Sequence, residues 1–247
     1  MPEIELFEIL IYLTTGAAAG LLAGLLGVGG GLFIVPVLLF VLPRVGVDTP
    51  HLMTVCVATS LGTIVITSLS SIIAHHKHQA ILWPVFRQLL PGIVVGSLIG
   101  AYVADWVSEQ VLTHLFAVSV IVIALRMLFK FQTTSQAQLP GFAVLSLAGS
   151  FIGGLSTMIG IGGGALSVPI LKYWQIPMAK AVATSAACGL PIAIAGTLGF
   201  IVIGFKQPDL PSYSSGYVYW PAVLGIVSSS FLSCHNNLIC KGCSTTT

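Results

Sequence analysis

The sequence contains very few charged residues. Only 6% of its 247 residues are Asp, Glu, Lys or Arg, whereas about 25% is usual for a soluble globular domain. Hydrophobic residues make up 56% of the chain, and the mean hydropathy is +1.02. Too few charges remain to cover a surface in water, which excludes a soluble domain. Apolar runs of about 20 residues, long enough to cross the hydrocarbon core of a bilayer, predict an all-α polytopic membrane protein.

Acidic residues are missing from these apolar runs. The seven Asp and Glu residues lie near the N-terminus or in predicted turns and loops. Coupling to protons or Na⁺ commonly uses a carboxylate inside the membrane, so the sequence disfavours a cation pump of that kind. The net charge of +2 is spread over loops without a basic patch. We therefore expect the bilayer as a partner and no nucleic acid.

Motifs for catalysis and for bound groups are lacking too. The apolar runs contain neither paired aspartates nor a serine–histidine set, so we expect that the protein is not an enzyme. Gly160-x-Gly162-x-x-Ala165 formally matches a dinucleotide fingerprint, but no acidic residue follows about 20 positions later. Cys240-x-x-Cys243 has the spacing of zinc ligands without a second ligand pair. The sequence predicts no cofactor and no metal site.

Glycine, by contrast, is concentrated in a motif that occurs twice. The two copies read Gly27-Val28-Gly29-Gly30-Gly31-Leu32-Phe33-Ile34-Val35-Pro36 and Gly160-Ile161-Gly162-Gly163-Gly164-Ala165-Leu166-Ser167-Val168-Pro169. Three adjacent glycines in an apolar helix predict an unwound hinge, because glycine adopts backbone conformations closed to other residues. Broken helices in corresponding places of two halves indicate the binding site of a repeat-built transporter. Close helix packing is the alternative explanation.

The repeat continues beyond the hinges. Val57-Ala58-Thr59-Ser60 follows the first hinge, and Val182-Ala183-Thr184-Ser185 follows the second. Trp220-Pro221 aligns, more weakly, with Leu90-Pro91. The resulting organisation is a first transmembrane repeat (residues 1–131), a linker (132–139), a second and incomplete repeat (140–230) and an atypical polar tail (231–247). We expect the last helix of the second repeat to be missing, through truncation or a frameshift.

Basic residues in short loops predict which side of the membrane each loop faces. The loop over residues 75–87 and the stretch over 126–138 carry Lys and Arg and are expected to be cytoplasmic, whereas the Asp105/Glu109 turn is expected to be external. If each hinge region crosses the membrane twice, the two repeats are inverted; a single crossing makes them parallel. We favour inversion, because inverted repeats place two broken helices face to face at the midplane.

The hinge chemistry suits a small anion. Free amide groups and the positive ends of helix dipoles attract negative charge, and neighbouring hydroxyls can donate hydrogen bonds. The predicted substrate-binding residues are Gly27, Gly29, Gly30, Gly31, Thr59, Ser60, Gly160, Gly162, Gly163, Gly164, Thr184 and Ser185. Pro36 and Pro169 are predicted to be structural parts of the hinges, each in the first turns of the helix that follows. The alternative role for the hydroxyls is ordinary hydrogen bonding, either between helices or to the carbonyl four residues earlier in the same helix.

The doubled hinge, each copy followed by Val-Ala-Thr-Ser, resembles the TauE/SafE family of sulfite and organosulfonate exporters. The resemblance covers roughly residues 7–228, and the chain departs from the family pattern after Ser228. It implies a multi-pass carrier of small sulfur-containing anions in the bacterial inner membrane, commonly an exporter. The substrate would bind between the two hinges while the halves rock. The alternatives are an anion channel that uses the two hinges as its selectivity constriction, or an inactive truncated membrane subunit.

Overall fold

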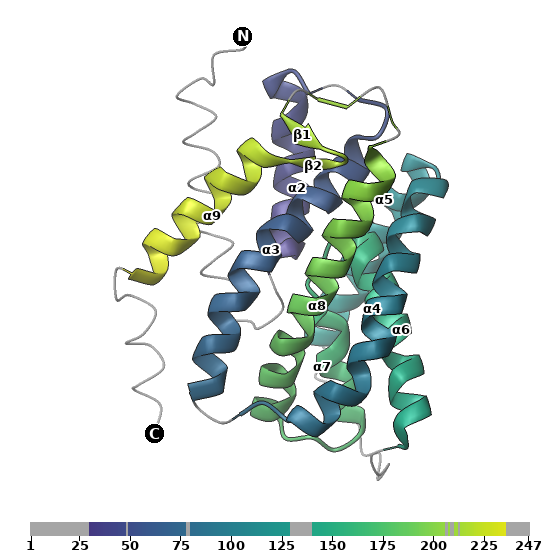
Figure 1. Ribbon diagram of the computed structural model, residues 1–247, viewed down its shortest axis with the longest axis vertical. Helices are drawn as coiled ribbons and strands as arrows, with labels where there is room; N and C mark the ends of the chain where they lie inside the picture. The colour runs from purple at the N-terminus through teal and green to yellow at the C-terminus, as the bar shows by residue number, and fades with distance from the viewer. Residues whose placement is uncertain are drawn as a thin grey trace.

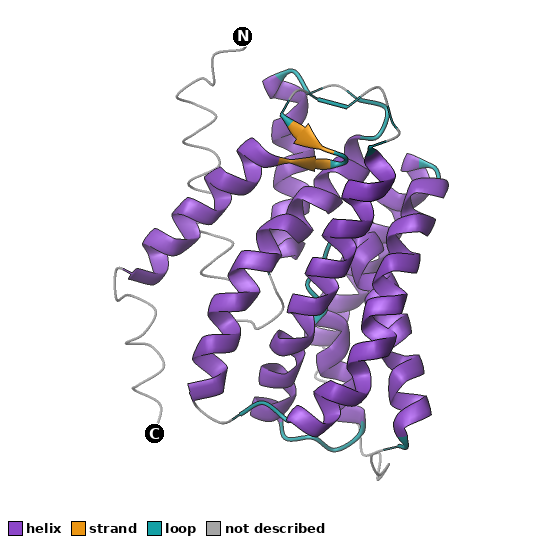
Figure 2. Ribbon diagram, in the orientation of Figure 1, coloured by secondary structure: helices purple, strands orange, loops and turns teal. Residues whose placement is uncertain are grey.

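A computed structural model describes residues 30–47, 49–77, 80–128, 140–205, 207, 210–211 and 213–235. This part of the chain is almost entirely helical, with one short two-stranded hairpin as its only sheet (Figure 2). The prediction of an all-α fold is therefore confirmed. Three groups of residues with predicted roles fall outside the described residues: Gly27 and Gly29, the linker over 132–139, and residues 236–247 of the predicted tail.

The helices form a bundle whose members differ in length (Figure 1). In chain order the elements are α2 (Gly31–Val41), η1 (Leu42–Val45), α3 (Leu52–Lys77), α4 (Trp83–Trp106), α5 (Glu109–Leu128), α6 (Phe142–Ile159), α7 (Gly164–Tyr173), α8 (Met178–Gly204), β1 (Ser214–Ser215), β2 (Val218–Tyr219) and α9 (Trp220–His235). Among the described residues, α3, α4, α6 and α8 are long and apolar enough to cross a membrane. The helices α2 and α7 have 11 and 10 residues, so each spans about half of a hydrocarbon core.

The second glycine motif breaks the helix as predicted. Gly160 has φ 75°, a left-handed conformation that other residues rarely adopt, and it ends α6. The amide of Gly160 donates to the Thr157 carbonyl, and the next amide donates to the carbonyl one residue further back. These two bonds close the last turn of α6. Gly163, also at φ 75°, then begins α7.

The helices α6 and α7 form a hairpin that returns to the end of the bundle from which it came. Ile159 and Ala165, on either side of the break, belong to one apolar cluster. Ile152 and Leu171, each further from the break, belong to another. This pairing runs in opposite directions along the two helices. The helix α8 then starts at the lower end of the bundle in Figure 1 and rises through it.

The helices α4 and α6 pack in parallel with their backbones in contact. The contacting pairs are Gly92 with Ser146, Gly96 with Ser150 and Gly100 with Gly154. A Cβ atom added at Gly96 would lie 2.1 Å from the carbonyl oxygen of Ser150. The spacing between partners is constant along the chain, so the two helices run in the same direction. This interface joins the first half of the chain to the second.

The helices α3 and α8 lie at the centre and run in opposite directions (Figure 1). Their most apolar windows are 72% and 56% buried inside the protein, more than those of α4 and α6. The two helices carry the corresponding Val-Ala-Thr-Ser motifs, and inverted halves require corresponding helices to run in opposite directions. The repeat relationship itself stays a prediction.

Replacement of Gly96 by alanine tests the α4–α6 contact. In an ordinary helix, Gly→Ala stabilises by up to about 1 kcal/mol. Here the methyl group would meet the backbone of Ser150, so we expect Gly96→Ala to lower the unfolding free energy by about 1–3 kcal/mol. Thermal unfolding of the purified protein in detergent measures the change. Gly141→Ala is the control, because no atom lies within 4 Å of its added Cβ; equal stability of the Gly96 variant and the wild type would contradict the prediction.

Candidate functional site

The two hinges touch inside the bundle. Gly31 is the first residue of α2, and a Cβ added to it would lie 2.1 Å from the carbonyl oxygen of Gly160. Both residues are buried. Only glycine at position 31 permits this approach, because the neighbouring atom belongs to the backbone and cannot rotate away. In this conformation, no space for a bound molecule separates Gly31 from Gly160.

The remaining hinge glycines in the described part of the chain are also buried. Gly30 precedes α2, and its carbonyl accepts hydrogen bonds from the amides of Phe33 and Ile34. A Cβ on Gly162 would lie 2.8 Å from the Ile64 side chain of α3. From the other side, a Cβ on Gly189 of α8 would lie 2.5 Å from the carbonyl oxygen of Gly162. The break is therefore held between the two central helices.

The two serines predicted to bind substrate donate to the second hinge. The Oγ atom of Ser60 donates to the Gly160 carbonyl at 3.0 Å. The Oγ atom of Ser185 makes a longer contact of 3.4 Å with the Gly164 carbonyl. Both side chains are fully buried. In this conformation both serine hydroxyls donate to backbone carbonyls of the protein. This agrees with the alternative role, in which the hydroxyls form ordinary hydrogen bonds within the protein.

The two threonines of the same motifs accept hydrogen bonds from amides of the opposite half. The Oγ1 atom of Thr59 accepts from the amide of Tyr219 at 3.1 Å, and that of Thr184 accepts from the amide of Leu82 at 3.0 Å. Both threonines are fully buried. Each donor amide immediately precedes a long helix, α9 for Tyr219 and α4 for Leu82.

These bonds also bear on how the two predicted repeats align. The residues after the two donor amides are Trp220-Pro221 and Trp83-Pro84, which begin α9 and α4. Within the predicted repeat, the matching bonds favour aligning Trp220-Pro221 with Trp83-Pro84 over its alignment with Leu90-Pro91. The physical reason is position: proline suits the start of a helix, where no amide is needed, whereas Pro91 lies in the interior of α4.

Pro36 and Pro169 lie inside the half-helices rather than at the break. Each is the sixth residue of its helix, α2 or α7. A proline in the first turn costs no hydrogen bond, but at this position it removes the donor for the carbonyl four residues earlier. Those carbonyls belong to Leu32 and Ala165.

Three hydroxyls that the sequence-based prediction overlooked lie next to the break. Ser156 and Thr157 are in the last turn of α6, and Ser167 is in the first turns of α7. All three are fully buried, and their side-chain oxygens have no hydrogen-bond partner among the described residues. An unsatisfied buried hydroxyl costs about 1–3 kcal/mol, so such groups call for an explanation. Their closeness in sequence to the glycines is the signal that would have found them.

The start of α7 adds further donors at this place. No side chain in the described part of the chain caps this helix. The amides of Gly164 and Ala165 have no acceptor within the helix, since the first amides of any α-helix lack one. They also lie at the positive end of the helix dipole. The α6–α7 break therefore combines an uncapped helix start with buried hydroxyl groups, an arrangement suited to a small anion.

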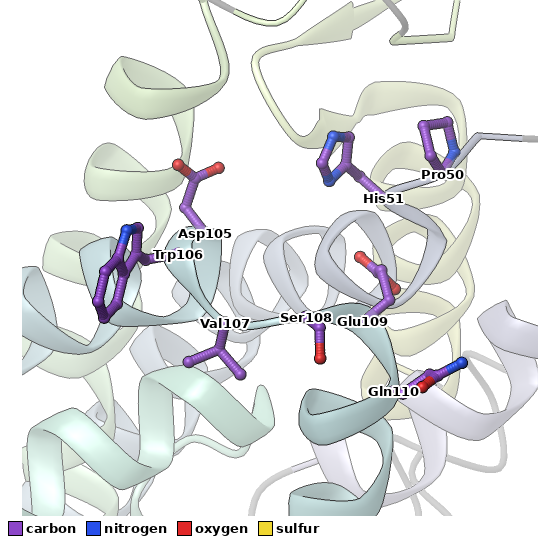
Figure 3. Close-up of a pocket in the computed structure, with 8 residues that line it drawn as sticks. All are labelled: Pro50, His51, Asp105, Trp106, Val107, Ser108, Glu109 and Gln110. Carbon is purple, nitrogen blue, oxygen red and sulfur yellow. The ribbon is translucent and has the colours of Figure 1, made fainter.

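Carboxylates lie elsewhere, around a hollow at one end of the bundle (Figure 3). There the Glu109 carboxylate caps the start of α3, accepting from the Met53 amide at 2.7 Å and from the Thr54 hydroxyl at 2.9 Å. The Tyr217 hydroxyl donates to Asp105. Burial, and secondarily this bond, raise the pKa of Tyr217 above its ordinary value. These groups hold helix ends and the β1–β2 hairpin in place.

Removal of the Ser60 hydroxyl tests its structural role. We expect Ser60→Ala to lower the unfolding free energy by about 1–3 kcal/mol without any substrate present, because the buried Gly160 carbonyl loses its donor. Thermal unfolding in detergent measures this loss. The matched variant is Ser70→Ala, whose exposed hydroxyl donates only to a carbonyl of its own helix, and it should unfold like the wild type. If Ser60→Ala also unfolds like the wild type, the Ser60–Gly160 bond has no structural role.

Comparison with known proteins gives a consistent assignment. The family model described as sulfite exporter TauE/SafE matches residues 12–234. A probable membrane transporter protein of Haemophilus influenzae is 41% identical over 228 residues, which cover 91% of this chain and 86% of that protein. A probable membrane transporter protein of Methanocaldococcus jannaschii is 29% identical over 88% of this chain and 82% of its own length. One of Bacillus subtilis is also 29% identical, over 91% of this chain and 85% of its own length. No solved structure matches the chain. The chain belongs to the sulfite exporter TauE/SafE family and is a multi-pass membrane transporter.

Proposed function

We propose that this protein is a secondary carrier of a small sulfur oxyanion, sulfite or an organosulfonate, that binds at the α6–α7 break. The observation that carries the proposal is the set of unpaired donors there. The uncapped start of α7 and the hydroxyls of Ser156, Thr157 and Ser167 are all buried. The family description supports the choice of sulfite among oxyanions.

The distribution of charge agrees with an anionic substrate. Asp105 and Glu109 are the two carboxylates in the described part of the chain, and both lie at the end of the bundle. An anion at the break would therefore meet neutral donors and no nearby carboxylate among the residues that the structure describes. Amides and hydroxyls arranged in advance stabilise an anion in an apolar interior without a cation.

The closed contact between the hinges suggests how a carrier would work. Because Gly31 lies directly against Gly160, the substrate cannot enter between them unless α2 and α6–α7 separate. Rocking of one half against the other would provide that movement, as in other repeat-built transporters. The structure then corresponds to a state closed at the hinge.

The basic residues favour a cytoplasmic location for the lower end of Figure 1. The α7–α8 connection lies at this end, with Lys172 before it and Lys180 after it, and Arg87 lies in the first turns of α4. Asp105 and Glu109 lie at the opposite end. The rule that Lys and Arg accumulate in cytoplasmic loops supports this orientation in a bacterial inner membrane.

Loss of the unpaired hydroxyls should weaken binding without weakening the fold. In Ser156→Ala and Ser167→Ala no hydrogen bond within the described protein is removed, so unfolding temperatures should not fall. A hydrogen bond to a charged group contributes about 1.5–3 kcal/mol, which predicts a KM for sulfite raised roughly tenfold or more. Efflux of radiolabelled sulfite from proteoliposomes gives the KM.

The control for this measurement is Ser68→Ala, which removes a buried hydroxyl that donates to Ile64 within α3. Its KM should equal that of the wild type. An unchanged KM in both the Ser156 and Ser167 variants would remove the α6–α7 break from the binding site. Efflux that saturates and accelerates with sulfite outside identifies a carrier, whereas efflux without this counterflow stimulation identifies a channel.

A side chain at Gly163 should stop transport while the protein still inserts. Gly163 has φ 75°, and a Cβ there would lie 2.4 Å from the Ile192 side chain. The left-handed conformation alone costs other residues about 1–2 kcal/mol, so we expect Gly163→Leu to reduce sulfite flux at least about tenfold. Gly62→Ala is the control, since its added Cβ has only ordinary contacts, at 3.4 Å and beyond. Normal flux through the Gly163 variant would contradict a role for the break.

A further inference from the structure

The two halves are joined at opposite ends by a matching pair of hydrogen bonds. At one end Thr59 of α3 accepts from the amide of Tyr219. At the other end Thr184 of α8 accepts from the amide of Leu82. In each case a central helix of one half holds the residue that precedes a helix of the other half. Both bonds join a backbone amide to a threonine hydroxyl oxygen, at 3.1 and 3.0 Å.

The positions of these bonds fit two gates. Thr59 is seven residues after the start of α3, and Thr184 is six residues after the start of α8. At 1.5 Å per residue, each threonine lies about 10 Å inside its helix end. Because α3 starts at the upper end of Figure 1 and α8 at the lower end, one bond lies near each end of the bundle.

Each threonine is next to a serine that contacts the hinge. Ser60 follows Thr59 and donates to the Gly160 carbonyl. Ser185 follows Thr184 and contacts the Gly164 carbonyl. A change at the hinge that shifts either serine therefore also moves the neighbouring threonine, since one turn of helix carries both. The threonine–serine pair links the hinge to one end of the bundle.

We propose that Thr59 and Thr184 are the latches of two alternating gates, each keeping one end of the bundle closed. This inference rests on the proposed carrier function, because a carrier opens to one side at a time. Both latches are closed in this structure. During transport one latch opens while the other stays closed. The serine next to each threonine transmits a movement of the hinge to that latch.

Accessibility of two reporter cysteines tests the latches. Val218 precedes Tyr219, Ile81 precedes Leu82, and both side chains are buried. Val218→Cys and Ile81→Cys are placed separately in a chain whose Cys234, Cys240 and Cys243 are replaced by serine. The reactions of a membrane-impermeant maleimide are followed in right-side-out and inside-out vesicles. The same chain without a reporter gives the background from the buried Cys56 and Cys188.

We expect Thr59→Val to raise labelling of Val218→Cys roughly tenfold, the effect of losing one buried hydrogen bond, without a change at Ile81→Cys. Thr184→Val should do the reverse, and from the opposite side of the membrane. Thr59→Ser and Thr184→Ser keep the acceptor oxygen and should label like the wild type. Thr197→Val is the matched control, because its buried hydroxyl has no partner among the described residues.

The proposal is overturned if neither reporter responds, or if each threonine variant exposes both ends equally. Labelling needs no substrate, so it separates this proposal from that of sulfite transport. One-sided labelling without sulfite flux would support the latches and overturn the choice of sulfite. Saturable flux with no labelling response would leave the carrier and overturn the latches.

Discussion

The approach of two backbones, at Gly31 and Gly160, is the contact on which the centre of this protein depends. No side chain fits there, since even a methyl group on Gly31 would lie 2.1 Å from the Gly160 carbonyl oxygen. The approach brings α2 against the α6–α7 break. It also leaves the Gly160 carbonyl within reach of Ser60 on α3. Glycine thus allows an unwound segment to be held by neighbouring helices, which is the condition for irregular backbone inside a membrane.

Two sets of buried hydroxyl groups, one on the central helices and one beside the α6–α7 break, differ in their hydrogen bonding. The Thr59, Ser60, Thr184 and Ser185 hydroxyls are bonded to backbone groups, mostly across the two halves. These bonds stabilise the closed arrangement. Ser156, Thr157 and Ser167 have no partner among the described residues, and they lie in the helix turns on either side of the break. The first set is therefore suited to stabilising one conformation of the protein, and the second to binding a substrate.

Such a division would matter for the proposed carrier, which has to close tightly and still release its substrate. Bonds between a threonine hydroxyl and an amide are individually weak enough to break during each cycle. The parallel α4–α6 interface is a different kind of contact, since its backbones pack directly along several turns. It is the closest backbone packing between the two halves that the described residues show.

Composition and the glycine pattern alone determined that this is an all-α membrane protein with a broken helix at Gly160–Gly163. Both conclusions depend on local physics: few charges, apolar runs of sufficient length, and backbone angles open only to glycine. The partners of Thr59 and Thr184 and the unpaired hydroxyl of Ser167 required the tertiary structure. A hydroxyl in an apolar run has the same sequence pattern whether or not a partner faces it, and that partner is set by how distant helices pack.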